Sequence, residues 1–200
     1  MILYRFIRRI SFEIYRLYSR YVTTISFRGN GVSYTTFSTI GIPYIMIAQG
    51  GVCHIGKNFT MNNGIKGNPI GSYERCTIFA DKGASLLIGN DVGISQCALI
   101  SHCLIKIGNR VKIGGGTGIF TTDFHSTDYR LRASREDTNH RICRKVIIDD
   151  DVFIGAHCII LKGVTIGARS IIGAGSVVTH SIPPDEIWAG NPARFIKKLD

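Results

Sequence analysis

The sequence predicts an all-β protein: a parallel β-helix of hexapeptide coils with an amphipathic helix before it, one long protruding loop and a short C-terminal tail. Two observations predict this class. Aliphatic residues recur every six positions over much of the chain, and 23 glycines stand against 5 prolines without a collagen triplet, which indicates many tight backbone turns. The length of 200 residues, 44% of them hydrophobic, suits one domain with a real core.

The first 24 residues predict an amphipathic helix. Its apolar residues recur at steps of three and four, and the other face is rich in arginine; the apolar set is Leu3, Phe6, Ile7, Ile10, Ile14, Leu17, Tyr18 and Tyr21. Charges interrupt this segment too often for a signal peptide or a membrane span, so we expect a cytoplasmic protein. Either the stripe packs on its own domain or a neighbouring subunit, or residues 1–20 contact the anionic inner membrane surface.

Six consecutive hexads after residue 147 set the predicted fold. Each begins with a β-branched aliphatic residue, namely Ile148, Ile154, Ile160, Ile166, Ile172 and Val178. A period of six fits neither a helix nor a simple alternating strand. It fits a triangular coil with sides of six residues, in which the lead aliphatic and the slender fifth residue point inward and glycine relieves the turn. Coils of this kind stack on one another, so stability sums over neighbours.

Earlier hexads extend the β-helix towards the N-terminus. Ile88, Ile94 and Ile100 keep the register, as do Ile107, Ile113 and Ile119, and a first irregular coil begins near Ile55. We therefore expect coils over about residues 50–182, in a domain spanning 25–184, and a tail at 185–200. The polar interruption at 120–146 predicts a functional loop. The six cysteines lack metal-site spacing and are expected to be free thiols.

Three stretches carry a resemblance to a known family: TTDFHSTDYR at 121–130, the coils at 151–183, and IWAGNPARFIKKL at 187–199. The chain resembles the hexapeptide-repeat acetyltransferases, and among them the maltose/galactoside and surface-polysaccharide O-acetyltransferases. The resemblance implies a left-handed β-helix, a homotrimer, acetyl-CoA as the co-substrate and no metal. It also implies a sugar or glycan acceptor, as in building cell-envelope polysaccharide.

His125, in the polar loop, is the candidate general base. Imidazole titrates near working pH, and the family's catalytic histidine matches this position. We expect His125 to deprotonate an acceptor hydroxyl that attacks the thioester directly. Asp123 and Asp128 are the candidates to orient its ring, and Asn62 matches a family asparagine that contacts the acceptor.

The resemblance places acetyl-CoA along the C-terminal coils and tail. The positions that match family contacts, or stand where the family has one, are Phe153, Ala156, Ala174, Thr179, His180, Arg194 and Lys197. Small residues allow the pantetheine arm to lie against backbone amides, and the basic tail suits the nucleotide phosphates. Two positions depart from the family: Phe153 replaces a usual tryptophan, and His180 replaces a common lysine.

Several other functions remain open at this point. Within acyl transfer they are N-acetylation of an amino-sugar nucleotide and O-acetylation of an antibiotic or other small molecule. A γ-type carbonic anhydrase has a similar coil, but the paired histidine phrase of that family is missing. A non-catalytic trimeric scaffold is the last alternative. The formal charge of +10 predicts an anionic partner, yet without a nucleic-acid-binding motif we expect no nucleic acid.

Overall fold

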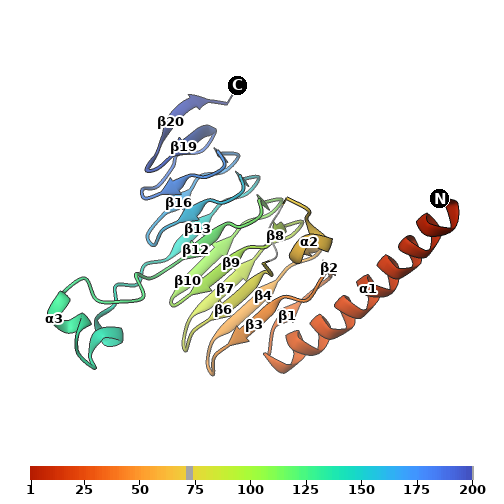
Figure 1. Ribbon diagram of the computed structural model, residues 1–200. Coiled ribbons are helices and arrows are strands. Elements are labelled where there is room, and N and C mark those ends of the chain that lie inside the picture. The colour runs from red at the N-terminus through yellow and green to blue at the C-terminus, as the bar shows by residue number, and fades with distance from the viewer. Residues whose placement is uncertain (71–73, 200) are drawn as a thin grey trace.

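The computed structural model describes residues 1–70 and 74–199. Three sheets of mainly parallel strands form the walls of a triangular β-helix, and the chain passes from one sheet to the next at each corner (Figure 1). The predicted positions 71–73 of the coil domain and Asp200 of the tail lie outside the described residues. Helix α1 projects from one end of the stack, and the C-terminal hairpin lies at the other end (Figure 1).

Six coils make up the stack, each with one strand in every sheet. The first three are β1 (Ser33–Tyr34), β2 (Phe37–Ile40) and β3 (Tyr44–Ile47); β4 (Val52–Ile55), β5 (Phe59–Asn62) and β6 (Thr77–Ala80); and β7 (Ser85–Ile88), β8 (Gly93–Ser95) and β9 (Ala98–Ser101). The next three are β10 (Leu104–Ile107), β11 (Lys112–Ile113) and β12 (Gly118–Phe120); β13 (Val146–Ile148), β14 (Phe153–Ile154) and β15 (Ile159–Ile160); and β16 (Thr165–Ile166), β17 (Ile171–Ile172) and β18 (Val177–Val178).

The predicted hexad register is confirmed in the last two coils. Ile148 pairs with Ile166, Ile154 with Ile172, and Ile160 with Val178. Each pair is 18 residues apart (166 − 148 = 18), so one coil consumes three hexads. All of these lead side chains are buried, as are the fifth-position residues Val152, Cys158, Val164, Ser170 and Ser176.

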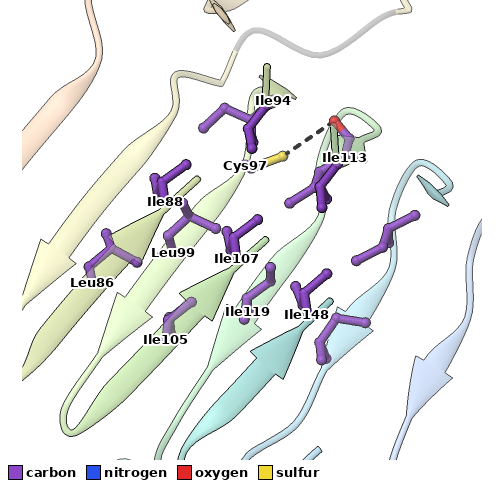
Figure 2. Packing of buried hydrophobic residues seen from close by; sticks show 14 of the residues in the cluster. Leu86, Ile88, Ile94, Cys97, Leu99, Ile105, Ile107, Ile113, Ile119 and Ile148 are labelled. Carbon is purple, nitrogen blue, oxygen red and sulfur yellow. Dashed lines mark hydrogen bonds between the residues drawn. The ribbon is translucent and has the colours of Figure 1, made fainter. Parts of the chain in front are cut away.

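The lead aliphatics lie close together inside the triangular β-helix. Figure 2 shows Ile107 and Ile119 of the fourth coil beside Ile148 of the fifth. In the same view the thiol of Cys97 faces the carbonyl oxygen of Ile113, 3.9 Å away. All six cysteines are free thiols, and four of them are buried. The prediction that they serve as small hydrophobic residues is confirmed for Cys53, Cys76, Cys97 and Cys158.

Glycine at the second position of the hexads has a different role from the one expected. The left-handed corner conformations belong to the fourth position, as at Asp151 (φ 62°), Gly163 (φ 82°) and Arg169 (φ 64°). Gly155 is required because the next coil lies too close: a Cβ there would be 2.6 Å from the backbone nitrogen of Ala174. Close packing between coils, rather than relief of the turn, explains this glycine.

Two features of the early coils differ from the prediction. A complete coil at residues 33–47 precedes the expected start near residue 50. A second interruption separates β5 from β6 and includes the short helix α2 (Gly64–Gly67). The first coil was missed because Phe37, Thr39 and Ile45 fill its interior, and these three do not follow the aliphatic-glycine hexad.

Helix α1 (Ile2–Gly29) is five residues longer at its C-terminal end than predicted. Only its last third packs on the β-helix: Ser19, Thr23 and Phe27 are buried, and the Phe27 ring lies 4.9 Å from that of Phe37. The apolar stripe from Leu3 to Tyr21 is exposed. The alternative in which this stripe packs on its own domain is therefore wrong. In the described part of the chain, no helix is both long and apolar enough to cross a membrane.

The predicted tail forms a hairpin of β19 (Glu186–Gly190) and β20 (Ala193–Lys198). Strand β19 pairs in parallel with β17, so the hairpin extends the sheet that also contains β5, β8, β11 and β14. This sheet is called sheet B below. Trp188 packs against the core from β19, which fastens the hairpin to the last coil.

Candidate active site

The long loop leaves the β-helix after β12 and returns at β13, close to its predicted bounds. It contains α3 (Tyr129–Arg132) and the 3-10 helix η1 (Asp137–His140), and it projects to one side of the stack (Figure 1). At its base, Thr122 and Cys143 form an antiparallel bridge, and the amide of Arg144 donates to the carbonyl oxygen of Thr121 at 2.9 Å.

The His125 ring lies beside the carboxylate of Asp137. The distance from Nδ1 to Oδ2 is 2.6 Å, and the other oxygen of Asp137 accepts a hydrogen bond from the amide of Ser126 at 2.7 Å. The hydrogen bond from His125, followed by that from Ser126, lowers the pKa of Asp137. An ionised carboxylate only accepts hydrogen bonds, so Nδ1 carries the hydrogen and Nε2 has the free lone pair. The imidazole is 64% exposed.

Asp137 was not among the predicted site residues. Within the described structure, the two predicted carboxylates have other partners: Asp123 contacts Lys162 at 2.5 Å, and Asp128 pairs with Arg130 at 2.9 Å. Asp128 also caps α3 by accepting the amide hydrogen of Arg130. Asp137 lies 12 residues from His125 in a segment without periodicity, and no pattern in the sequence distinguishes it from the other loop acids.

A cluster of partly exposed groups holds the start of the loop against the β-helix. Asp81 contacts His102 Nδ1 and the guanidinium of Arg141, each at 2.7 Å. The Phe124 ring packs edge-on against His102, with centroids 5.8 Å apart. Phe124 has φ 67°, a left-handed conformation that costs a residue with a side chain roughly 1–2 kcal/mol. These contacts offset that strain and set the backbone directly before His125.

Two other predicted residues meet in a groove on the outer face of sheet B. Asn62 and Phe153 line this groove of about 230 Å³ together with Thr60, Ser95 and Lys112. The side-chain nitrogen Nδ2 of Asn62 donates to the hydroxyl of Ser95 at 3.3 Å, and Phe153 is 48% exposed. The groove therefore offers hydrogen-bonding groups beside an aromatic wall.

The remaining predicted positions lie on the last two coils and on the C-terminal hairpin. Ala156 and Ala174 come after β14 and β17, on successive coils, and the amide of Gly175 donates to the Ala156 carbonyl oxygen at 2.8 Å. Thr179 and His180 contact each other at 2.8 Å just after β18. Arg194 and Lys197 lie on β20, opposite Ala189 and Ile187.

Within one chain, His125 and the groove belong to different sides of the triangular β-helix. The loop connects β12 to β13, which belong to the two other sheets, whereas Asn62 and Phe153 lie on sheet B. Among the described residues, no group of three or more His, Cys, Asp or Glu side chains could hold a metal ion.

The comparisons first define the class of the coils. Residues 145–180 match the family model described as bacterial transferase hexapeptide (six repeats). The fold resembles an N-acyltransferase from Bacillus cereus, solved with dTDP-4-amino-4,6-dideoxyglucose and coenzyme A, with a TM-score of 0.68 and 21% identity over 88% of each chain. The recognition of a hexapeptide-repeat protein and the predicted left-handed parallel β-helix are confirmed.

Two curated relatives are acetyltransferases by name. A putative acetyltransferase of Schizosaccharomyces pombe is 38% identical over 105 residues, which cover 52% of this chain and 48% of the relative. The galactoside O-acetyltransferase of Escherichia coli is 32% identical over 124 residues, which cover 62% of this chain and 59% of the relative. The chain thus spans about half the length of these curated relatives.

Proposed function

We propose that this protein is an acetyl-CoA-dependent O-acetyltransferase that transfers acetyl to a hydroxyl of a sugar or glycan. The observation that carries the proposal is the His125–Asp137 pair on the protruding loop. A carboxylate that fixes one ring nitrogen and leaves the other free is the arrangement that a general base needs. The similarity to a galactoside O-acetyltransferase supports a sugar hydroxyl as the acceptor.

In this proposal, His125 Nε2 accepts the proton of the acceptor hydroxyl while the hydroxyl oxygen bonds to the thioester carbonyl carbon. The carbon–sulfur bond then breaks, and the imidazolium returns the proton to the sulfur, which leaves as the free thiol of CoA. Asp137 holds the ring through Nδ1 and stabilises the imidazolium without taking its proton.

The groove on sheet B is our candidate for the acyl end of acetyl-CoA and for the acceptor. Phe153 provides an apolar wall for the acetyl group, and Asn62 a polar group for the sugar. The corner at Ala156 and Ala174 suits the pantetheine arm because methyl side chains let a ligand approach the backbone amides. Thr179, His180, Arg194 and Lys197 extend this path, and the charges of Arg194 and Lys197 on β20 suit the CoA phosphates.

A homotrimer completes this proposal. Because the loop and sheet B lie on different sides of one β-helix, the loop of one copy meets the groove of the next copy at a subunit seam. The exposed His125 ring is then covered by the neighbouring subunit. An active site shared between subunits exists only in the assembled oligomer.

The test measures free-thiol release from acetyl-CoA with a panel of sugars and amino sugars, and product mass shows which acceptor gains an acetyl group. We expect turnover with hydroxyl acceptors and a loss of at least about 100-fold in His125→Ala, with CoA binding retained. His140→Ala is the matched control, because His140 is an exposed histidine of the same loop. Near-normal turnover in His125→Ala would refute the assignment, and acetylation of amines alone would make the enzyme an N-acetyltransferase.

A further inference from the structure

The first two thirds of α1 carry a large apolar surface that the β-helix leaves uncovered. The eight residues of the stripe from Leu3 to Tyr21 have exposed fractions between 44% for Ile10 and 70% for Leu3. The helix leaves the stack at an angle, and its N-terminus lies far from the coils (Figure 1). At 1.5 Å per residue, the segment before Ser19 is about 26 Å long.

The stripe points directly away from the β-helix. Residues of an α-helix follow one another at about 100°, so Leu3, Ile10 and Leu17 lie on one side, opposite Phe12, Ser19 and Thr23. Ser19 and Thr23 are fully buried against the first coil, where the Ser19 hydroxyl accepts the amide hydrogen of Gly41. The docking of the helix's C-terminal third therefore fixes the direction in which the apolar side faces.

The charge of α1 indicates what covers the stripe. The helix contains six arginines and one acidic residue, Glu13, so it contributes +5 (6 − 1) to the chain's formal +10. Arg5, Arg8 and Arg9, together with Lys66 of α2, line a crevice of about 970 Å³ along α1, which Ile7 at the edge of the stripe also lines. The cations thus lie beside and behind the apolar stripe rather than within it.

We propose that α1 lies on an anionic lipid surface, with the stripe inserted among the acyl chains and the arginines at the depth of the phosphates. A helix with an apolar face, an arginine-rich polar face and low mean hydropathy is suited to the membrane interface. The proposal goes beyond acetyl transfer and does not depend on it. Its consequence is that the β-helix is held beside the membrane.

A second copy of the chain fits this face less well. Two α1 helices packed through their stripes would leave the six arginines of each helix on the outer sides of the pair, with Glu13 as the sole acidic residue on each helix. Such a pair supplies no counter-charge for these arginines, whereas an anionic leaflet does. Charge complementarity therefore favours lipid over self-association.

The experiment is co-sedimentation of the full chain with vesicles. The probes are vesicles of phosphatidylglycerol and phosphatidylcholine in equal parts, and vesicles of phosphatidylcholine alone. We expect binding to the anionic vesicles that weakens as salt is raised, and binding to the neutral ones at least about tenfold weaker. Absence of binding to anionic vesicles, or equal binding to both kinds, would overturn the proposal.

Two double variants locate the contact. Phe6→Ser with Leu17→Ser removes part of the stripe, and Tyr4→Ser with Phe12→Ser removes a similar apolar area from the side that lines the crevice. We expect at least a tenfold loss of vesicle binding in the first and little change in the second, with the mass in solution unchanged in both. If the first variant retains binding, the stripe is not the lipid contact and the proposal is wrong. If it changes the oligomeric mass instead, a second copy of the chain covers the stripe and the proposal is equally wrong.

Discussion

The coils of the β-helix and the loop at residues 121–145 are held in place in opposite ways. In the coils, the lead aliphatics from Ile88 to Val178 are buried between neighbours above and below. The prediction is wrong at one position, because Leu99, which pairs with Ile119, takes the inward place expected for Ile100. The loop depends on a few polar contacts, chiefly Asp81 with His102 and Arg141, and Asp137 with His125. A substitution inside the coils should therefore lower the free energy of unfolding and spare the site, whereas loss of one loop contact should alter the geometry of the site and spare stability.

The largest effect on stability is expected when one buried aliphatic side chain of the coils is truncated. Ile160→Ala leaves a cavity in the interior of the fifth coil, where Ile160 is fully buried. We expect a loss of about 3 kcal/mol in the free energy of unfolding, measured by urea denaturation. Because Ile160 does not contact the His125–Asp137 pair, turnover per folded molecule should change less than about twofold.

Ile196→Ala is the matched control, because the same side chain is 57% exposed on β20. Its expected effect on the free energy of unfolding is below about 0.5 kcal/mol. If both variants lose equal stability, the coils are not held together by the burial of their lead residues.

The reverse behaviour is expected in the loop. Asp137→Asn keeps the size of the side chain but allows its amide to donate to His125 Nδ1, which moves the ring hydrogen to Nε2 and removes the free lone pair. We expect turnover to fall by roughly 10- to 100-fold, with little change in the free energy of unfolding or in KM for acetyl-CoA. Steady-state kinetics and urea denaturation together measure this.

Asp128→Asn is the control for that variant, since Asp128 is a carboxylate of the same loop that pairs with Arg130 instead. A fall in turnover as large as that of Asp137→Asn would show that general disorder of the loop, rather than the tautomer of His125, limits the reaction.

The same comparison explains which parts were predictable from sequence. A hexad is a local pattern repeated many times, so Ile148 to Val178 established both the coils and their register before any coordinates. The coil at 33–47 lacks that pattern, because Phe37, Thr39 and Ile45 fill its interior. The face of α1 that docks could not be predicted either, since the buried contacts are Ser19 and Thr23 rather than the apolar stripe.

The candidate site divides in the same way. The position of His125 on a polar excursion was predicted from the interruption of the repeat. Asn62 and Phe153 came from the family resemblance, and the groove that they share is a finding of the structure. The partner of His125 could not be predicted from the sequence, because Asp137 reaches it through an irregular loop whose path depends on contacts with Asp81 and His102. Such long-range polar contacts leave no periodic trace in a sequence.

Lowering the pH should unfold the loop before the coils, and this is the smallest of the expected effects. The hydrogen bonds from His125 and Ser126 lower the pKa of Asp137. Burial raises the pKa of Asp81, but the Lys82 amide, His102 and Arg141 outweigh it and the net shift is downward. A carboxyl whose pKa is lower in the folded state stabilises that state above its unfolded pKa of about 3.9, and the contribution disappears as the pH falls through the folded value.

We therefore expect the loop to detach below about pH 4 while the coils stay folded. Hydrogen exchange, corrected for the intrinsic rate at each pH, should show the amide of Ser126 losing protection before those of β14 to β17. The coils also have ion pairs at their corners, such as Arg110 with Asp151 and Arg169 with Asp185. Exposed pairs of this kind contribute little to the free energy of unfolding compared with the buried aliphatic interior. Simultaneous loss of protection in both regions would mean that the loop and the coils form one cooperative unit, and that their contrast in the folded structure has no counterpart in stability.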